Sequence, residues 1–519
     1  MTRTILSLIV SMVLISSCGQ KSETGSQLGQ TNFIVEGSAE AMPYFDKGLL
    51  LLHSFEYEDA AEEFKKAREL DPNFAMAYWG EAMTYNHTLW SEQEIGKAKD
   101  VLNLLGADEQ ERSSRTDAEI EKSFISAVGI LFESDDDKLV RDQNYMKYMR
   151  KMYEKYPEHH DVAAFYSLSL LGSVPDGRDV RVYEQAAEIA KVILEENPEH
   201  PGALHYLIHS YDDPQHAELA INAADKYSKV APDAAHALHM PTHIYLALGM
   251  WDKVISSNID SWEASKKRKA RKELDNNALG YHSYSWLHYG MLQNGRFQEA
   301  DSMLSVMIIY TESLPSKRAR SYLVRMKGAF LVETNEWDHK HSEIEVEVND
   351  LSLLTRSANS FINGMTEYSK ENESALDLII ESMSTDISTE AGKILVDGIT
   401  VCSISDNESQ PASQLSVDQS RIMELELRGL HSLMINDTTA AFDWLTQATA
   451  LESSISYSFG PPDVIKPSHE LYGELLLTME NYDAAAQMFT EALSRAPGRS
   501  ASEKGKEFAA DKFRNVASN

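Results

Sequence analysis

The sequence predicts an all-α protein, a right-handed α-solenoid built from antiparallel helix pairs. Two observations lead to this fold class. A helix-pair pattern with a period of about 34 residues recurs along the chain, and no segment is rich in strand-forming residues. Because each helix pair can bury its apolar face only against its neighbours, such an array shares one continuous core.

The repeating unit is clearest near the two ends of the chain. Each unit has small residues and an aromatic residue on its second helix, and a proline follows that helix. These residues are Tyr57, Ala60, Phe64, Ala67 and Pro72 in the first unit, and Tyr482, Ala485, Phe489, Ala492 and Pro497 in the last. The small residues allow close approach of two helices, the aromatic residue fills the space between neighbours, and the proline ends the helix. Both units resemble the tetratricopeptide repeat, and we expect about eight repeats in all.

Two units in the middle of the chain are in consecutive register. Val254 lies 34 residues after Ala220, whereas Ala300 lies 46 residues after Val254. The second interval implies an insertion of about a dozen residues relative to the usual period. The basic segment at residues 265–277, SKKRKARKELDNN, is the predicted insertion.

Four segments extend the resemblance beyond a generic repeat. AMAYWGEAM, GALHYLIHSYDD, HALHMPTHIYLALGMWD and KPSHELYGELLL together are similar to a group of exported bacterial tetratricopeptide-repeat proteins. The resemblance covers most of residues 40–500. The biochemical role of that group is largely uncharacterised, so the resemblance implies a fold much more than an activity.

The N-terminus predicts export and lipid attachment. Arg3 precedes an apolar run at residues 5–15, which is too short to span a bilayer and is typical of a signal peptide. Ile15-Ser16-Ser17-Cys18 resembles the lipobox of bacterial lipoproteins, which implies lipidation of Cys18. We therefore expect a protein anchored to the bacterial cell envelope, at the outer membrane or the periplasmic face.

The predicted organisation follows from these features. Residues 1–17 are the signal peptide and 18–32 a flexible tether, followed by an N-terminal repeat array (33–335), a degenerate helical or linker region (336–420) and C-terminal repeats (421–510). The formal net charge is −33, so we expect no nucleic-acid partner. Repeat arrays present a concave surface, and we expect a protein, a peptide or a small ligand to bind there.

Histidines are concentrated on the predicted inner helices. Eleven of the 17 lie between His159 and His288. Counted back from the turn residue of each repeat, several fall at matching offsets and therefore on one helical stripe. The resemblance implies that this stripe faces the groove, where peptide-binding relatives hold a terminal carboxylate. The predicted groove residues are His205, His209, Asp212, His236, His239, His243 and His282.

Three interpretations of this stripe remain open. His205, His209, His239 and His243 form a candidate metal site for a divalent ion such as zinc, with Asp212 as a carboxylate. Alternatively, neutral histidines line a peptide or ligand groove without metal, or they are only structural. If they line an open groove, alanine at His239 and His243 leaves the melting temperature almost unchanged.

Catalytic motifs do not point to an enzyme. HYLIH lacks the glutamate of HExxH, and the sequence has no glycine-rich phosphate loop and no G-x-S-x-G elbow. The sequence therefore favours a binding protein over an enzyme.

Overall fold

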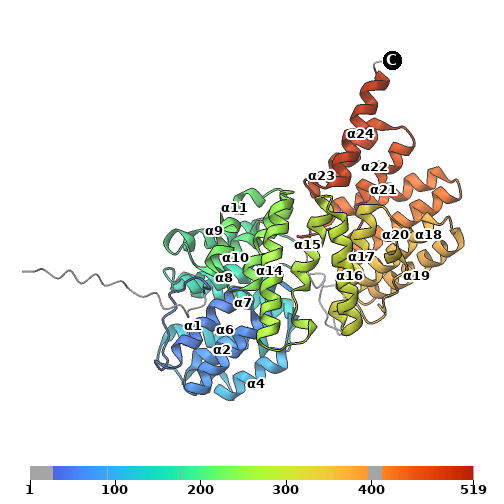
Figure 1. The fold of residues 1–519 in the computed structure, drawn as a ribbon. Helices are drawn as coiled ribbons and strands as arrows, with labels where there is room; N and C mark the ends of the chain where they lie inside the picture. Colours follow the sequence, from blue (N-terminus) through green and yellow to red (C-terminus); the bar gives the residue numbers. More distant parts are fainter. Residues whose placement is uncertain (1–26, 91, 176, 395–411, 518–519) are drawn as a thin grey trace, which may run out of the picture.

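The computed structural model describes residues 27–517 except 91, 176 and 395–411, and it confirms the all-α solenoid (Figure 1). The helices up to the middle of the chain are α1 (Met42–His53), α2 (Tyr57–Leu70), α3 (Ala75–Met83), α4 (Ile95–Leu105), α5 (Glu109–Ser113), α6 (Glu119–Phe132), α7 (Lys138–Lys155), α8 (His160–Gly172), α9 (Val180–Glu196), α10 (Pro201–Ser210), α11 (Ile221–Val230), α12 (Ala235–His239), α13 (Pro241–Ala247) and α14 (Trp251–Arg271). The signal peptide and Cys18 lie outside the described residues.

The second half continues the array. Its helices are α15 (Tyr281–Gln293), α16 (Phe297–Ser313), α17 (Lys317–Thr334), α18 (Leu353–Ser369), α19 (Glu373–Ala391), α20 (Gln414–Met434), α21 (Thr438–Ser454), α22 (Ser468–Thr478), α23 (Tyr482–Arg495) and α24 (Ser500–Ala517). Short 3-10 turns are η1 (Thr88–Trp90), η2 (Ala217–Ala220), η3 (Asn276–Ala278) and η4 (Lys340–Glu343), and β1 (Asn86–His87) pairs antiparallel with β2 (Glu92–Gln93).

The repeat signature occupies the positions that its packing role requires. Ala60 and Phe64 on α2 are fully buried, as are Ala485 and Phe489 on α23. Gly80 on α3 lies so close to the Phe64 ring that an added Cβ would clash with it. The aromatic ring and the missing side chain therefore let two helices approach closely.

The turns within the helix pairs share a left-handed residue two positions before the second helix. Gly249 (φ +66°) precedes α14 and Gly295 (φ +70°) precedes α16 in this way. Non-glycine residues take the same conformation at Asn436 before α21 and Glu480 before α23. The repeat geometry is thus kept where glycine, the easiest residue for this conformation, is absent.

The predicted insertion lengthens α14 and fastens it to the first repeat. Arg268 donates a hydrogen bond of 2.8 Å to Glu58, and Lys272 donates hydrogen bonds to Asp59 (2.7 Å) and Glu62 (2.8 Å). All three acidic residues lie on α2. The basic run therefore joins segments about two hundred residues apart.

The described part of the predicted tether, residues 27–32, packs on the array and is not free. Leu28 is buried, the Gln27 backbone N–H donates to Asp233 at 2.6 Å, and Gln30 donates to the Glu199 backbone oxygen at 3.0 Å. The prediction of a flexible tether up to residue 32 is wrong for this stretch because its apolar residue finds a site between repeats. Within 336–420, the structure forms the helix pair α18 and α19, and α20 begins at Gln414.

The C-terminal repeat folds back onto the middle of the array. The indole of Trp251 donates to the Gly498 backbone oxygen at 2.8 Å, and the fully buried Arg499 donates to Tyr289 and to both oxygens of Glu470, each at 2.8 Å. These contacts join α22–α24 to the turn before α14 and to α15. Figure 1 shows α24 extending from this junction.

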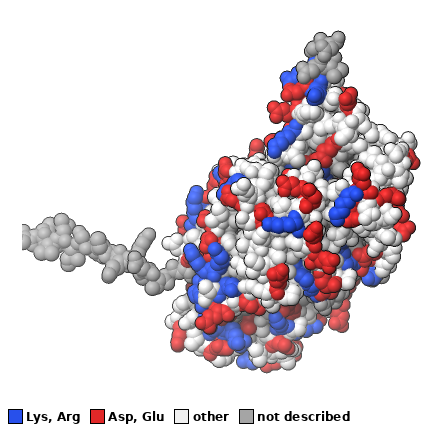
Figure 2. Space-filling view, turned by 45° about the vertical axis from the view of Figure 1, so that its right-hand side comes forward, with Lys and Arg blue, Asp and Glu red and all other residues white. Residues whose placement is uncertain are grey.

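The exterior carries charges of both signs. Figure 2 shows Lys and Arg residues scattered among Asp and Glu residues, without a continuous basic face in that view. Among the residues that the structure describes, no helix is long and apolar enough to cross a membrane.

Candidate metal centre

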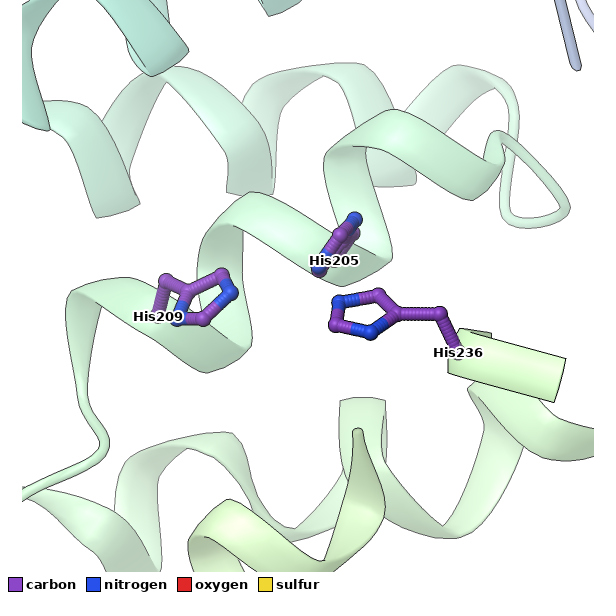
Figure 3. A group of neighbouring side chains, drawn as sticks. All are labelled: His205, His209 and His236. Carbon is purple, nitrogen blue, oxygen red and sulfur yellow. The ribbon is translucent and has the colours of Figure 1, made fainter. Parts of the chain in front are cut away.

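Six histidines from three consecutive inner layers of the array come together. His205 and His209 lie on α10, His236 and His239 on α12, His243 on α13 and His282 on α15. The helix break at Pro241 separates α12 from α13 but leaves His239 and His243 neighbours, with ring centroids 5.2 Å apart. Figure 3 shows the rings of His205, His209 and His236 converging from α10 and α12.

The six residues form two groups of three. One ring nitrogen from each of His205, His209 and His236 lies within 4.8 Å of the others, and the same holds for His239, His243 and His282. We call these groups triad A and triad B. The sequence prediction placed His205, His209, His239 and His243 around one ion, whereas the structure separates them into two pairs and adds His236 and His282.

Local structure fixes the ring orientation in triad A. The helix α10 begins at Pro201 after His200, whose ring accepts the Ala203 backbone N–H at 3.2 Å, so its start is well defined. His205 Nδ1 lies 2.8 Å from the backbone oxygen of His53. Because a backbone oxygen can only accept, Nδ1 of His205 carries the proton and Nε2 carries the lone pair.

His239 in triad B is oriented by an amide. Its Nδ1 lies 2.7 Å from Asn258 Oδ1, while the Asn258 amide nitrogen donates to the Val254 backbone oxygen at 3.0 Å. The second bond fixes which end of the amide faces the histidine. Nδ1 of His239 is therefore the donor, and its Nε2 is again free to accept or to bind a metal.

Asp212 lies behind the rings and connects the two triads. Its Oδ2 accepts from His209 Nδ1 at 3.1 Å and from His243 Nδ1 at 3.0 Å, and its Oδ1 pairs with Arg178. Burial alone would raise the pKa of Asp212, but Arg178 and the two histidines hold that pKa well below its usual range. Asp212 with His209 and His243 also forms a group whose ligand atoms lie within 4.8 Å of one another, so the predicted metal carboxylate stays a prediction. Its hydrogen bonds to both rings equally suit a group that orients metal-binding histidines.

The inner ring nitrogens have no partner. Nε2 of His205, His209, His236, His239 and His243 is buried, and none of the five has a hydrogen-bond partner within the described chain. A buried polar atom without a partner destabilises a fold by about 1–3 kcal/mol. Other buried histidine nitrogens of the described chain, such as both of His288, also lack a partner, but these five lie on rings that are grouped together. Such a group of free nitrogen lone pairs is the ligand type that a transition-metal ion needs.

Burial keeps the rings of His205, His236, His239, His243 and His282 neutral. It lowers the pKa of His205, His236, His239 and His282 well below the usual value, with neighbouring histidines adding to the effect. Burial also lowers the pKa of His243 to about 4, against the opposing hydrogen bond to Asp212. At neutral pH these nitrogens therefore keep their lone pairs, and protons compete poorly with a metal ion.

An aromatic shell encloses the two triads. The ring centroids of Phe55 and His205 are 4.2 Å apart, and the ring centroid of Trp286 lies 4.8 Å from that of His239 and 4.7 Å from that of His243. Phe459 lies 5.0 Å from His243 and 5.9 Å from His209. Such a shell limits water at the nitrogens and lowers the local dielectric.

Phe459 belongs to a crossing segment, residues 455–467, which connects α21 to α22. The Arg178 backbone N–H donates to Ser456 Oγ at 3.1 Å, and Arg325 donates to Asp463 at 2.7 Å. Gly460 has φ +100° and lies so close to Trp286 that a Cβ would clash with the indole. The crossing segment thus closes the histidine centre from the distant end of the array.

A cavity of about 1510 Å³ adjoins the centre. Five of the six histidines line it, all except the fully buried His205. Its wall carries eight Lys or Arg and seven Asp or Glu residues, whereas the whole chain has 48 and 81. The cavity is therefore much less acidic than the rest of the protein.

The predicted open groove is wrong in one respect. His205, His209, His239 and His243 are all at most 5% exposed. The crossing segment covers these four rings, whereas His236 and His282 are partly exposed at the cavity. Alanine at His239 and His243 is therefore expected to affect packing, contrary to the expectation from the sequence.

Several residues of the site escaped sequence reasoning. Asn258 on the neighbouring helix α14 contacts His239, and Phe459 contacts His243 from a distant repeat. Arg178 pairs with Asp212 and so acts on the histidines through that carboxylate. Asn258 has a weak signal, as a polar residue four positions after the buried Val254 on an apolar stripe. Phe459 has none, because its position depends on how the whole array curves.

Two other histidine groups differ from the triads. His53 is hydrogen-bonded at both ring nitrogens, through Nδ1 to the Tyr206 hydroxyl at 2.9 Å and through Nε2 to Asp161 Oδ1 at 3.0 Å. His200 Nε2 lies 3.6 Å from the same Asp161 oxygen. Asp301 with His339 and His341 forms a partly exposed group in which His341 Nε2 pairs with Asp301 at 2.5 Å. In both groups a carboxylate already occupies the Nε2 position of one histidine.

Comparison with known proteins supports the repeat assignment in one region. The tetratricopeptide repeat family matches residues 467–499. Among curated proteins, no sequence matches the chain.

Solved structures that align with this chain include yeast Tom70 (12% identity, 92% of this chain and 89% of that chain, TM-score 0.32). The APC/C hetero-tetramer Cut9-Hcn1 aligns at 12% identity over 92% of this chain and 78% of that chain, with a TM-score of 0.38. The P58(IPK) TPR domain aligns at 16% identity over 92% of this chain and 99% of that chain, with a TM-score of 0.20. At these TM-scores the alignments carry no information about function.

Proposed function

We propose that this protein binds transition-metal ions through the Nε2 atoms of the six histidines. The observation that carries the proposal is the set of five buried Nε2 atoms without partners. A metal ion would supply the missing partner for each one. Imidazole nitrogen suits zinc, copper, iron and nickel, so these ions form the candidate class.

The spacing of the nitrogens fits an ion after small adjustments. Two nitrogens bound to one tetrahedral zinc ion at about 2.1 Å would be about 3.4 Å apart. The ligand atoms of each triad already lie within 4.8 Å of one another. Ring rotations and shifts of about 1 Å would be enough to close each set, and the hydrogen bonds on Nδ1 leave the required lone pairs in place.

Metal analysis of the protein purified without a histidine tag tests the proposal. We expect transition metal to copurify, or to bind the stripped protein at neutral pH and survive desalting. Replacing all six histidines with alanine should abolish retention. Because four of the six rings are buried, His236→Ala and His282→Ala, at partly exposed positions, serve as milder variants that should lower retention while the helical circular dichroism remains. The proposal is wrong if the unmodified protein retains no such metal after exposure to zinc, copper, iron and nickel.

A matched control uses histidines outside the centre. The double variant His339→Ala and His341→Ala removes the other metal-like group, which contains Asp301. It should retain the metal content of the unmodified protein. An equal loss in both variants would place the metal elsewhere.

A second candidate function is suggested by the cavity. Its size, its aromatic residues Tyr57, Trp90 and Trp286, and its basic residues suit a peptide or a small anionic ligand. A protein or peptide partner of the solenoid would bind here or on the outer surface. Binding of a peptide library to stripped and metal-loaded protein would test this function, and equal weak binding of all peptides would count against it.

We also propose that Cys18 is lipidated and holds the exported protein at the cell envelope. The lipobox-like Ile15-Ser16-Ser17-Cys18 supports this proposal. Radiolabelled palmitate should be incorporated into the full chain in a bacterial host and not into its Cys18→Ala variant. Labelling of neither would contradict the anchor without affecting the metal proposal.

A further inference from the structure

The two triads occupy the same positions of successive repeats. His205 and His209 lie ten and six residues before the turn residue Gln215, and His239 and His243 lie ten and six residues before Gly249. The interval between the two pairs is therefore 34 residues, one repeat.

The third member of each triad follows the same rule. His236 lies thirteen residues before Gly249, and His282 lies thirteen residues before Gly295. Each triad thus takes two histidines from one inner layer, which is α10 for triad A and the broken helix α12 and α13 for triad B, and a third from the start of the next layer. The interval from His236 to His282 is 46 residues because α14 carries the insertion.

The pattern ends after two copies. The positions ten and six residues before Gly295 are Ser285 and Tyr289, which cannot continue the series as imidazoles. In the other direction, the position thirteen residues before Gln215 is Gly202, where an added Cβ would clash with the His53 ring. The repeat geometry therefore builds the three-histidine set twice and no more.

The two sets lie side by side. The ring centroids of His209 and His243 are 5.0 Å apart, and those of His236 and His239 are 6.0 Å apart. Asp212 Oδ2 accepts from one histidine of each set, so a single carboxylate orients both. Two ions bound in the triads would be close enough to share a bridging ligand.

We propose that the duplicated triads bind a pair of transition-metal ions, one per repeat, as a dinuclear centre with three histidines to each ion. This inference rests on the proposed function and adds its stoichiometry and arrangement. Three protein ligands leave a coordination position open on each ion. Because His209, His236, His239, His243 and His282 line the cavity of about 1510 Å³, the open positions would face a space large enough for a small exogenous ligand.

Metal titration tests the number of ions. The untagged protein, stripped with chelator, is loaded with excess Cu(II), desalted and analysed for copper per chain. We expect two ions for the unmodified protein and one for each of His236→Ala and His282→Ala, which remove one ligand from triad A and triad B. His216 pairs with Asp213 in the unmodified protein and belongs to neither triad. The control variant His216→Ala should therefore retain two copper ions per chain.

Electron paramagnetic resonance tests the arrangement without relying on variants alone. Two adjacent Cu(II) ions should give a coupled signal whose spin count is below the copper content. Each single-triad variant should give one uncoupled spin per copper.

The outcomes separate the two proposals. One ion per unmodified chain overturns the dinuclear centre and leaves the proposed function in place, whereas no ion overturns both. Two ions with full, uncoupled spins would contradict the adjacency of the triads.

Discussion

Two buried histidine clusters in the N-terminal half of this protein use the same side chain in opposite ways. In the cluster of His53, Asp161 and His200, both nitrogens of His53 have partners, and His200 Nε2 faces the same carboxylate at 3.6 Å without a hydrogen bond. In the triads, the outer nitrogens of His205, His209, His239 and His243 have partners and the inner ones do not. Burial and residue type are therefore poor guides to function, and the informative observation is whether a carboxylate faces Nε2, as Asp161 does in the first cluster.

The largest expected effect is the rise in melting temperature when metal binds, which should depend on the triads and not on the cluster of His53, Asp161 and His200. An ion at a thousandfold excess over its dissociation constant stabilises the folded state by about 4 kcal/mol. Saturating metal should therefore raise the melting temperature of the unmodified protein relative to chelator-treated protein. The triple variant of triad A and the triple variant of triad B should each show a smaller rise, and the six-alanine variant none. If metal raised the melting temperature of the six-alanine variant as much as that of the unmodified protein, the triads would not be the metal site.

The next effect concerns the structural cluster. Asp161→Ala removes the acceptor of a buried hydrogen bond and leaves His53 Nε2 without a partner. Because hydrogen bonds to charged groups contribute up to about 3 kcal/mol, we expect a loss of about that size in urea unfolding. The folded variant should still bind metal as the unmodified protein does. A loss of metal without a loss of stability would reverse the assignment of the two clusters.

The third effect tests the group that orients both triads. Asp212→Asn keeps the size of the side chain but weakens its acceptance from His209 and His243. Loss of such an orienting group typically lowers metal affinity about 10–100-fold. Competition against a chelator of known affinity should show the decrease for both ions together, and Asp161→Asn should show none. An unchanged affinity in Asp212→Asn would mean that the carboxylate does not support the centre.

The smallest effect is expected at a partly exposed histidine. The His216 ring accepts or donates only locally, with its Nδ1 2.9 Å from Asp213. His216→Ala should change the free energy of unfolding by no more than about 0.5 kcal/mol. Its metal content should equal that of the unmodified protein. A larger change in either quantity would show that histidines outside the triads contribute to the centre.

The sequence predicted the features that repeat locally. The period, the buried Ala60 and Phe64, and the common stripe of His205, His209, His239 and His243 all follow from spacing within one or two repeats. The structure brings these histidines together as expected. It divides them into two groups, so the period was enough to find which histidines are neighbours but not how they are grouped.

What the sequence could not predict depends on long-range closure. The crossing segment reaches the triads from more than two hundred residues away, so Phe459 gives no periodic signal. The insertion in α14 carries Arg268 to Glu58 on the first repeat, although the same basic run also suits an exposed helix end. The role of Asp212 required knowing that His209 and His243 approach it from two different repeats.

The most direct measurement is X-ray absorption at the edge of the bound metal in the untagged protein. We expect a shell of nitrogen or oxygen ligands at about 2.0–2.1 Å and outer scattering from about three imidazoles per ion. This spectrum would show that imidazole nitrogens are the ligands, as the proposal requires. A sulfur shell, or an oxygen shell without imidazole scattering, would contradict the account.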